Sequence, residues 1–139
     1  MRIACVLLWW LVGCSSSIYL TVQTDANANF GAPVPVDVVF ANKPELENQL
    51  LPLTAAEWFA KRSQIQRDYP DESILRVVSF EFIPGQQRSE QKIKGNGAEM
   101  AIIFVNMGRS SATNRARVPT GSTVSLRIGE GSYQLELEK

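Results

Sequence analysis

The chain has 139 residues, enough for one domain with a substantial core, and its 14 basic residues balance its 14 acidic ones. This neutral balance offers no cationic surplus to bind nucleic-acid phosphates. Histidine is absent, which removes the commonest general base and metal ligand, and no phosphate-binding loop or nucleophile motif occurs. We therefore expect a non-enzymatic protein with no catalytic residues, metal, cofactor, nucleic acid or small-molecule substrate.

The first 17 residues, MRIACVLLWWLVGCSSS, have the pattern of a bacterial lipoprotein signal. Arg2 precedes an apolar run that suits a signal peptide but is too short for a membrane-spanning helix, which needs about 20 apolar residues. The run ends in the letters LVGC, which have the pattern of a lipobox, the motif that ends at the acylated cysteine. We expect residues 1–13 to be a signal peptide that is removed and Cys14 to be acylated.

Acylation at Cys14 has consequences for stability and location. Cys5 leaves with the signal, so the mature protein has no second cysteine for a disulfide. Ser15 stands where aspartate generally retains lipoproteins in the inner membrane. The sequence thus predicts a lipid anchor in the outer membrane, facing the periplasm, with 14–17 as acylated cysteine and tether and 18–139 as one domain.

The first strand is predicted over 18–23, where apolar and polar residues alternate. The segment 25–33 is rich in Asn and Asp, which tolerate turns and left-handed backbone, so we expect a loop there. A second strand follows over 34–41. The segment 42–53 contains two prolines and is predicted to be a connection.

One helix is predicted at about 54–69. Its first residues, Thr54-Ala-Ala-Glu57, form a capping box, in which the hydroxyl and the carboxylate satisfy backbone N–H groups reciprocally. Pro70 ends it. Trp58 and Phe59, near its start, are expected to pack in the core, with a binding role as the alternative.

The rest of the chain predicts strands separated by turns. Pro84-Gly85 favours a type II turn, and the Gly-rich segments 95–97 and 129–131 favour two more. The predicted strands are 74–83, 86–94, 99–107, 115–118, 123–128 and 133–138. Seven or eight short strands and one helix indicate a mainly β, two-sheet sandwich.

Two carboxylate pairs are the remaining candidates for chemistry. Asp71 and Glu72 follow a proline, and Glu136 and Glu138 alternate with leucines on the last strand, so both pairs are expected in solvent. Phe30 is a better candidate for function, because a lone aromatic among Asn and Gly can anchor a protein interface. The alternative is that Phe30 folds back as a lid over the end of the sandwich.

Three segments resemble the outer-membrane lipoprotein family of the type VI secretion system, called TssJ or SciN. They are DANANFGAPVPVDVVF (25–40), SFEFIPG (79–85) and the apolar strand 100–105. The resemblance implies a transthyretin-like sandwich with an added helix that anchors the periplasmic end of the inner-membrane protein TssM. It also implies that the loop 25–33 contacts the partner. The predicted contact residues are Asp25, Asn27, Asn29, Phe30 and Pro33.

A second reading comes from a different functional class. Small lipoproteins without cofactors also inhibit periplasmic toxins or hydrolases, as immunity proteins do. The segment 108–117 could serve such an inhibitor, since it carries Arg109, Arg115 and Arg117. A sugar-binding sandwich is a weaker possibility, because only Trp58 remains after signal removal and it is expected in the core.

Overall fold

The computed structural model describes residues 16–108 and 115–138. The predicted signal peptide (1–13), the predicted acylation site Cys14 and Arg109 lie outside these residues. No helix within the described ranges is long and apolar enough to cross a membrane.

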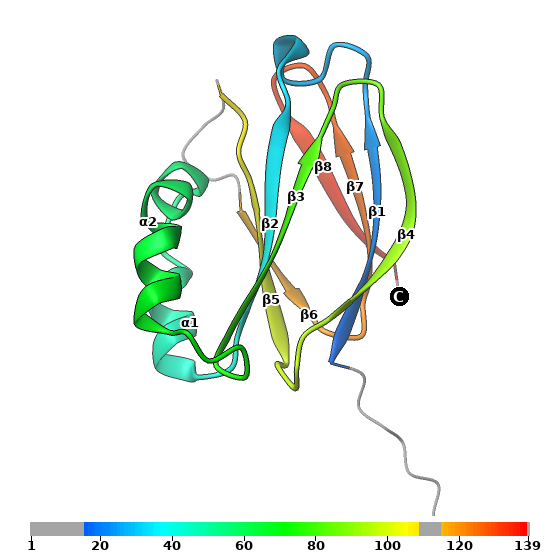
Figure 1. Ribbon diagram of the computed structural model, residues 1–139. Coiled ribbons are helices and arrows are strands. Elements are labelled where there is room, and N and C mark those ends of the chain that lie inside the picture. The colour runs from blue at the N-terminus through cyan, green and yellow to red at the C-terminus, as the bar shows by residue number, and fades with distance from the viewer. Residues whose placement is uncertain (1–15, 109–114, 139) are drawn as a thin grey trace, which may run out of the picture.

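Eight strands form two four-stranded sheets packed face to face, which confirms the predicted β-sandwich (Figure 1). One sheet has the order β4-β1-β7-β8 and the other the order β3-β2-β5-β6. Neighbouring strands are antiparallel except for β1 and β7, which are parallel. The elements are β1 (Ser17–Thr24), the 3₁₀ turn η1 (Ala28–Gly31), β2 (Val34–Ala41), α1 (Pro44–Leu50), α2 (Ala55–Asp68), β3 (Leu75–Phe82), β4 (Gln87–Lys94), β5 (Met100–Val105), β6 (Arg115–Pro119), β7 (Thr123–Ile128) and β8 (Tyr133–Glu138).

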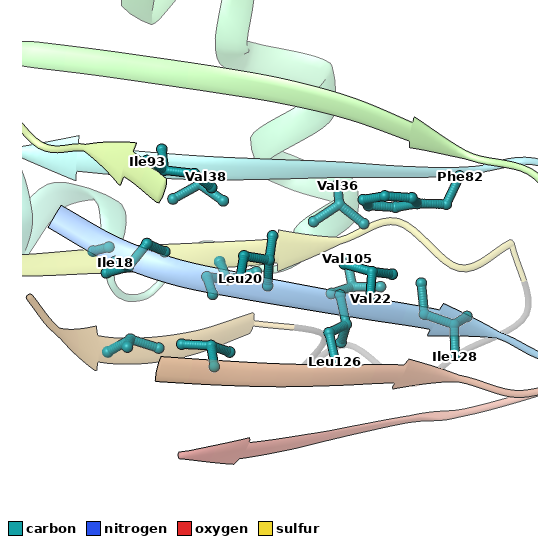
Figure 2. Packing of buried hydrophobic residues seen from close by; sticks show 14 of the residues in the cluster. Ile18, Leu20, Val22, Val36, Val38, Phe82, Ile93, Val105, Leu126 and Ile128 are labelled. Carbon is teal, nitrogen blue, oxygen red and sulfur yellow. The ribbon is translucent and has the colours of Figure 1, made fainter. Parts of the chain in front are cut away.

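The main core fills the space between the two sheets. Strand alternation places Ile18, Leu20 and Val22 of β1 on the inner face, where each is at most 3% exposed. Figure 2 shows these side chains facing Val36 and Val105 of the opposite sheet. The period-two pattern in the sequence therefore identified the inner face of β1 correctly.

A second core lies on the outer face of β3-β2-β5-β6, under the two helices (Figure 1). The Trp58 ring of α2 is fully buried and stacks on Phe104 of β5 with ring centroids 5.1 Å apart. Its indole N–H donates to the buried carboxylate of Asp37 on β2 at 2.8 Å, and Arg62 pairs with the same carboxylate at 3.1 Å. The core reading of Trp58 is thus confirmed.

The helix α2 begins as predicted. Glu57 accepts from the Thr54 backbone N–H at 2.8 Å, and the Thr54 hydroxyl accepts from the Glu57 N–H at 3.1 Å. These hydrogen bonds favour the charged carboxylate and lower the pKa of Glu57. The predicted helix at about 54–69 is confirmed, with Thr54 as its N-cap.

The segment 42–53 was predicted to be a connection, but it contains the helix α1. Proline interrupts a helix interior but is favoured in the first turn, where its missing N–H has no intrahelical partner. Pro44 occupies that position. Leu46 and Leu50, four residues apart, are buried against the outer face of the sheet. This spacing was the signal that the two prolines obscured.

A candidate interface at the apical end

The loop 25–33 crosses one end of the sandwich, because it joins β1 in one sheet to β2 in the other. We call this the apical end, and it comprises the loop 25–33, the turns 83–86 and 129–132 and the segment 106–108 (Figure 1, top). The contact residues predicted from the sequence all belong to this loop, so their surroundings decide what each can do.

Asp25 fixes the start of the loop mainly through its backbone. Its N–H donates to the carbonyl of Ile128 at 2.8 Å, and its carbonyl accepts from Gly85 at 2.9 Å. Its carboxylate pairs with Arg127 at 3.3 Å, where both side chains are partly exposed. Exposed ion pairs contribute little to stability, so the carboxylate and the guanidinium can re-pair with a partner at small cost.

Asn29 is buried and holds the centre of the loop. Its side-chain amide donates to the Pro33 carbonyl at 3.1 Å, and its side-chain oxygen accepts from the Gly108 N–H at 3.0 Å. Its backbone is left-handed, with φ of 47°, as the loop composition predicted. Asn29 therefore positions the loop, whereas the exposed Asn27 bonds only to Glu130, at 2.6 Å.

Asn29→Ala should lower the free energy of unfolding by about 1–3 kcal/mol, because it leaves polar groups without partners and strains the left-handed backbone. Urea denaturation followed by Trp58 fluorescence measures this. Asn27→Ala is the matched control and should change stability by at most about 0.5 kcal/mol, since surface substitutions rarely do more. Equal losses for the two variants would contradict a positioning role for Asn29.

Phe30 is 51% exposed although it is a large aromatic residue. Its ring lies against the β7–β8 turn, so that a Cβ on Gly131 would be 3.6 Å from the ring carbon Cζ. Its φ is 54°, an unfavourable value for a bulky side chain that is typical of functional sites. Phe30 therefore contacts the β7–β8 turn and also presents apolar surface to solvent.

Ile83 was not singled out by the sequence, but it is the most exposed large hydrophobic residue of the described chain, at 62%. It precedes the Pro84-Gly85 turn, whose Gly85 has the positive φ that the predicted type II turn requires. The Thr24 hydroxyl donates to the Ile83 carbonyl at 2.8 Å, which ties this turn to the start of the loop. The signal in the sequence that could have identified Ile83 was its position directly before a Pro-Gly turn.

The apical end also carries a hollow in its surface. A shallow hollow of about 300 Å³ lies beside Asp25, Arg127 and Tyr133. Burial raises the pKa of Tyr133, and the charge of Arg115 lowers it by a smaller amount. Within residues 16–108 and 115–138, no three His, Cys, Asp or Glu residues lie close enough to hold a metal.

The remaining candidate side chains lie away from the apical loop. The Asp71 carboxylate accepts from the Ser73 N–H and hydroxyl, which lowers its pKa, and Glu72 is exposed beside it. Glu136 and Glu138 are also exposed, as predicted. Arg117 of the alternative binding segment pairs with Glu47 of α1 at 2.7 Å, and residues 109–114 of that segment lie outside the described ranges.

No protein-family model matches the chain, and no curated protein sequence matches it. Several solved structures do match this chain in fold. The type VI secretion lipoprotein TssJ1 from Pseudomonas aeruginosa superposes with a TM-score of 0.66 at 12% identity, covering 91% of this chain and 98% of that one. Serratia marcescens Lip, a membrane-bound component of the same type of system, gives 0.64 at 14% identity, covering 91% and 99%.

A chain from the structure of the TssM C-terminal domain (869–1107) of EAEC, another type VI secretion protein, matches with a TM-score of 0.63 at 10% identity. The match covers 86% of this chain and 97% of that one. At such low identities the likeness establishes a shared fold. The predicted resemblance to the TssJ family is confirmed at that level.

Proposed function

We propose that this protein is a lipid-anchored component of a type VI secretion membrane complex. Acyl chains on Cys14 hold it in the outer membrane, and the apical end binds the periplasmic part of a TssM-like inner-membrane protein. The protein acts as a structural adaptor without catalysis. The observations that carry this proposal are the match in fold to TssJ1 and Lip over 91% of this chain and the lipobox that ends at Cys14.

The apical loop supports the partner-binding half of the proposal. Its backbone bonds to the turns 83–86 and 129–132, and the Asn29 side chain bonds to Gly108, so little conformational entropy is lost on binding. Two of the three exposed large hydrophobic residues in the described chain, Phe30 and Ile83, lie at this end. Exposed apolar side chains suit the centre of an interface, and the charges of Asp25 and Arg127 suit its polar rim.

Phe30→Ala should weaken binding to the periplasmic domain of the TssM-like protein by about 30-fold, corresponding to a hot-spot loss of about 2 kcal/mol. Phe30 is 51% exposed in the fold, so the melting temperature should change little. Isothermal titration calorimetry measures the affinity and calorimetric melting measures the stability.

Leu137→Ala is the matched control, because Leu137 is 45% exposed but pairs with Val124, toward the opposite end of the sandwich. This variant should bind normally. A large drop in melting temperature for Phe30→Ala with unchanged affinity would support the lid role instead. If the unmodified protein does not bind the TssM-like domain at all, the adaptor proposal is wrong.

A further inference from the structure

We call residues 14–17, the predicted acylated cysteine and tether, the N-terminal stem. The root of this stem, residues 16–17, lies at the end of the sandwich opposite the loop 25–33. We call this end the basal end, comprising residues 16–17, the segment 70–74 and the turns 95–97 and 120–122 (Figure 1, bottom). The Ser16 carbonyl accepts from the Gly95 N–H at 2.8 Å, and its hydroxyl accepts from the Gly97 N–H at 3.0 Å. The chain is therefore fixed to the fold two residues after Cys14.

The sequence of the turn 95–97 permits this close contact. A Cβ on Gly95 would lie 2.7 Å from the buried ring of Phe40 and would collide with the Ser16 carbonyl, so a glycine is required there. The next residue is fixed as well, because the Ser17 carbonyl accepts from the Gly121 N–H at 2.6 Å. The root of the stem is thus held between two turns.

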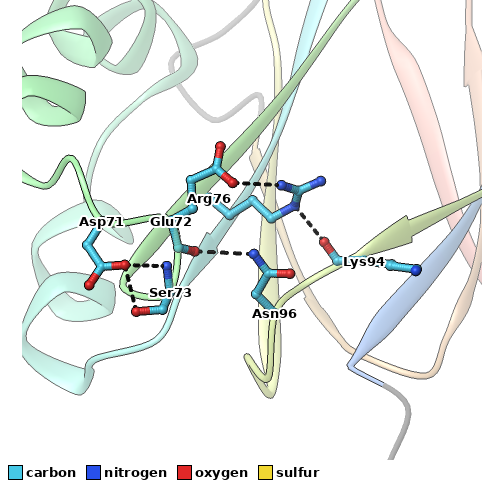
Figure 3. Close-up of polar contacts among 6 residues, drawn as sticks. All are labelled: Asp71, Glu72, Ser73, Arg76, Lys94 and Asn96. Carbon is cyan, nitrogen blue, oxygen red and sulfur yellow. Dashed lines mark hydrogen bonds and ion pairs between the residues drawn. The ribbon is translucent and has the colours of Figure 1, made fainter.

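Polar contacts link the segments of the basal end to one another, several of them drawn in Figure 3. The Arg76 guanidinium donates to the Lys94 carbonyl at 2.8 Å and to the Glu72 carboxylate at 3.4 Å. Asn42 donates to the carbonyls of Ser73 and Asn96, at 3.0 and 3.3 Å. These bonds join the end of β2, the start of β3 and the end of β4 into one platform.

The length of the stem brings this platform to the membrane. Two peptide units join Cys14 to Ser16, and they span at most about 7 Å. Exposed Lys43 follows Asn42, exposed Lys94 bonds to the partly exposed Arg76, and the exposed Asp71 and Glu72 lie in the segment 70–74. The cationic side chains can pair with the phosphates of phospholipid headgroups, and the carboxylates can accept from their ammonium or hydroxyl groups.

We propose that the basal end is a docking surface for the phospholipid headgroups of the membrane that holds the Cys14 acyl chains. This rests on the proposed acylation of Cys14. Docking orients the domain, because the strands run from the basal to the apical end. An eight-residue strand is about 27 Å long, so the loop 25–33 is presented roughly that far from the membrane surface.

The test uses the full acylated chain carrying one introduced cysteine for a fluorescent probe. Cys5 leaves with the signal and the Cys14 thiol is acylated, so Glu99→Cys labels only the basal side and Ala32→Cys only the apical loop; both positions are exposed. Each protein is reconstituted in vesicles of phosphatidylethanolamine and phosphatidylglycerol, and quenching by aqueous iodide is measured. We expect quenching at position 99 to be several-fold weaker than at position 32.

A second variant separates docking from anchoring. Twelve Gly and Ser residues inserted between Ser15 and Ser16 give a flexible stem and leave the Ser16 contacts in place. This variant should float with vesicles but lose the protection at position 99. Flotation with equal quenching at both positions in the native stem would overturn the docking surface while the anchor stands. Failure of the native-stem protein to float would overturn the anchor and the docking surface together.

Discussion

Replacing Trp58 with alanine should lower the free energy of unfolding by about 3–5 kcal/mol, the range for removing a large buried aromatic side chain. Trp58 is fully buried, stacks on Phe104 and donates to Asp37. The substitution leaves a cavity under α2 and also leaves the buried carboxylate of Asp37 with Arg62 as its remaining side-chain partner. Losing a partner of a buried charge adds to the cost of the cavity. Urea denaturation followed by circular dichroism measures the change.

Trp58→Phe separates the two contributions. The phenyl ring keeps much of the contact with Phe104 but cannot donate to Asp37, so we expect a smaller loss of about 1–3 kcal/mol from the unmade hydrogen bond. Phe59→Ala is the control, since Phe59 is an aromatic neighbour on the same helix that is only half-buried. If Trp58→Ala cost no more than Phe59→Ala, α2 would not depend on the Trp58–Asp37 contact.

The strands and α2 could be predicted because their signals are local. Alternation marked the inner face of β1, and the spacing of Thr54 and Glu57 marked the first turn of α2. The turns at Pro84-Gly85 and 95–97 could be predicted for the same reason, because the residues that favour a turn lie within it. The turn 95–97 nevertheless joins β4 in one sheet to β5 in the other, and that sheet assignment depends on long-range pairing which no local pattern contains.

The packing of the helices could not be read from the sequence. Asp37 lies within a strand of apolar residues, and its partners are contributed by α2, 21 and 25 residues further along the chain. An aspartate in an apolar strand is compatible with an edge, a bulge or a buried pair, and only the tertiary contact decides. The helix α1 was missed because two prolines outweighed the Leu46–Leu50 spacing.

The sequence located the candidate interface but could not assign roles within it. Asn27 and Asn29 are chemically identical and two residues apart, yet one is exposed and the other is buried with four hydrogen-bond partners, Ala32, Pro33, Gly108 and Gly129. The difference arises from Gly108 and Gly129, which bond to Asn29 from the segment after β5 and from the β7–β8 turn. Ile83 lies at the apical end only because the β3–β4 turn, far along the chain from the loop 25–33, folds to the same end of the sandwich.

Replacing Cys14 with alanine should abolish membrane attachment and leave the fold intact. Stable anchoring takes more than one acyl chain, and the near-neutral protein has no polybasic segment that could hold it on the membrane instead. In the part of the chain that the structure describes, the stem is fixed by the contacts of Ser16 and Ser17, and the substitution keeps both residues. Fractionation of the cell envelope should move the protein from the outer membrane to the soluble periplasm, with an unchanged melting temperature.

Cys5→Ala is the matched control, because Cys5 lies in the segment that signal cleavage removes. It should stay in the outer-membrane fraction and carry the same mass increase on Cys14 as the unmodified protein. If the Cys14→Ala protein remained in the outer-membrane fraction, attachment would have to come from protein contacts rather than lipid. The apical loop would then be the first candidate for those protein contacts. If it makes them, adding Phe30→Ala to the Cys14→Ala protein should release it from the outer-membrane fraction.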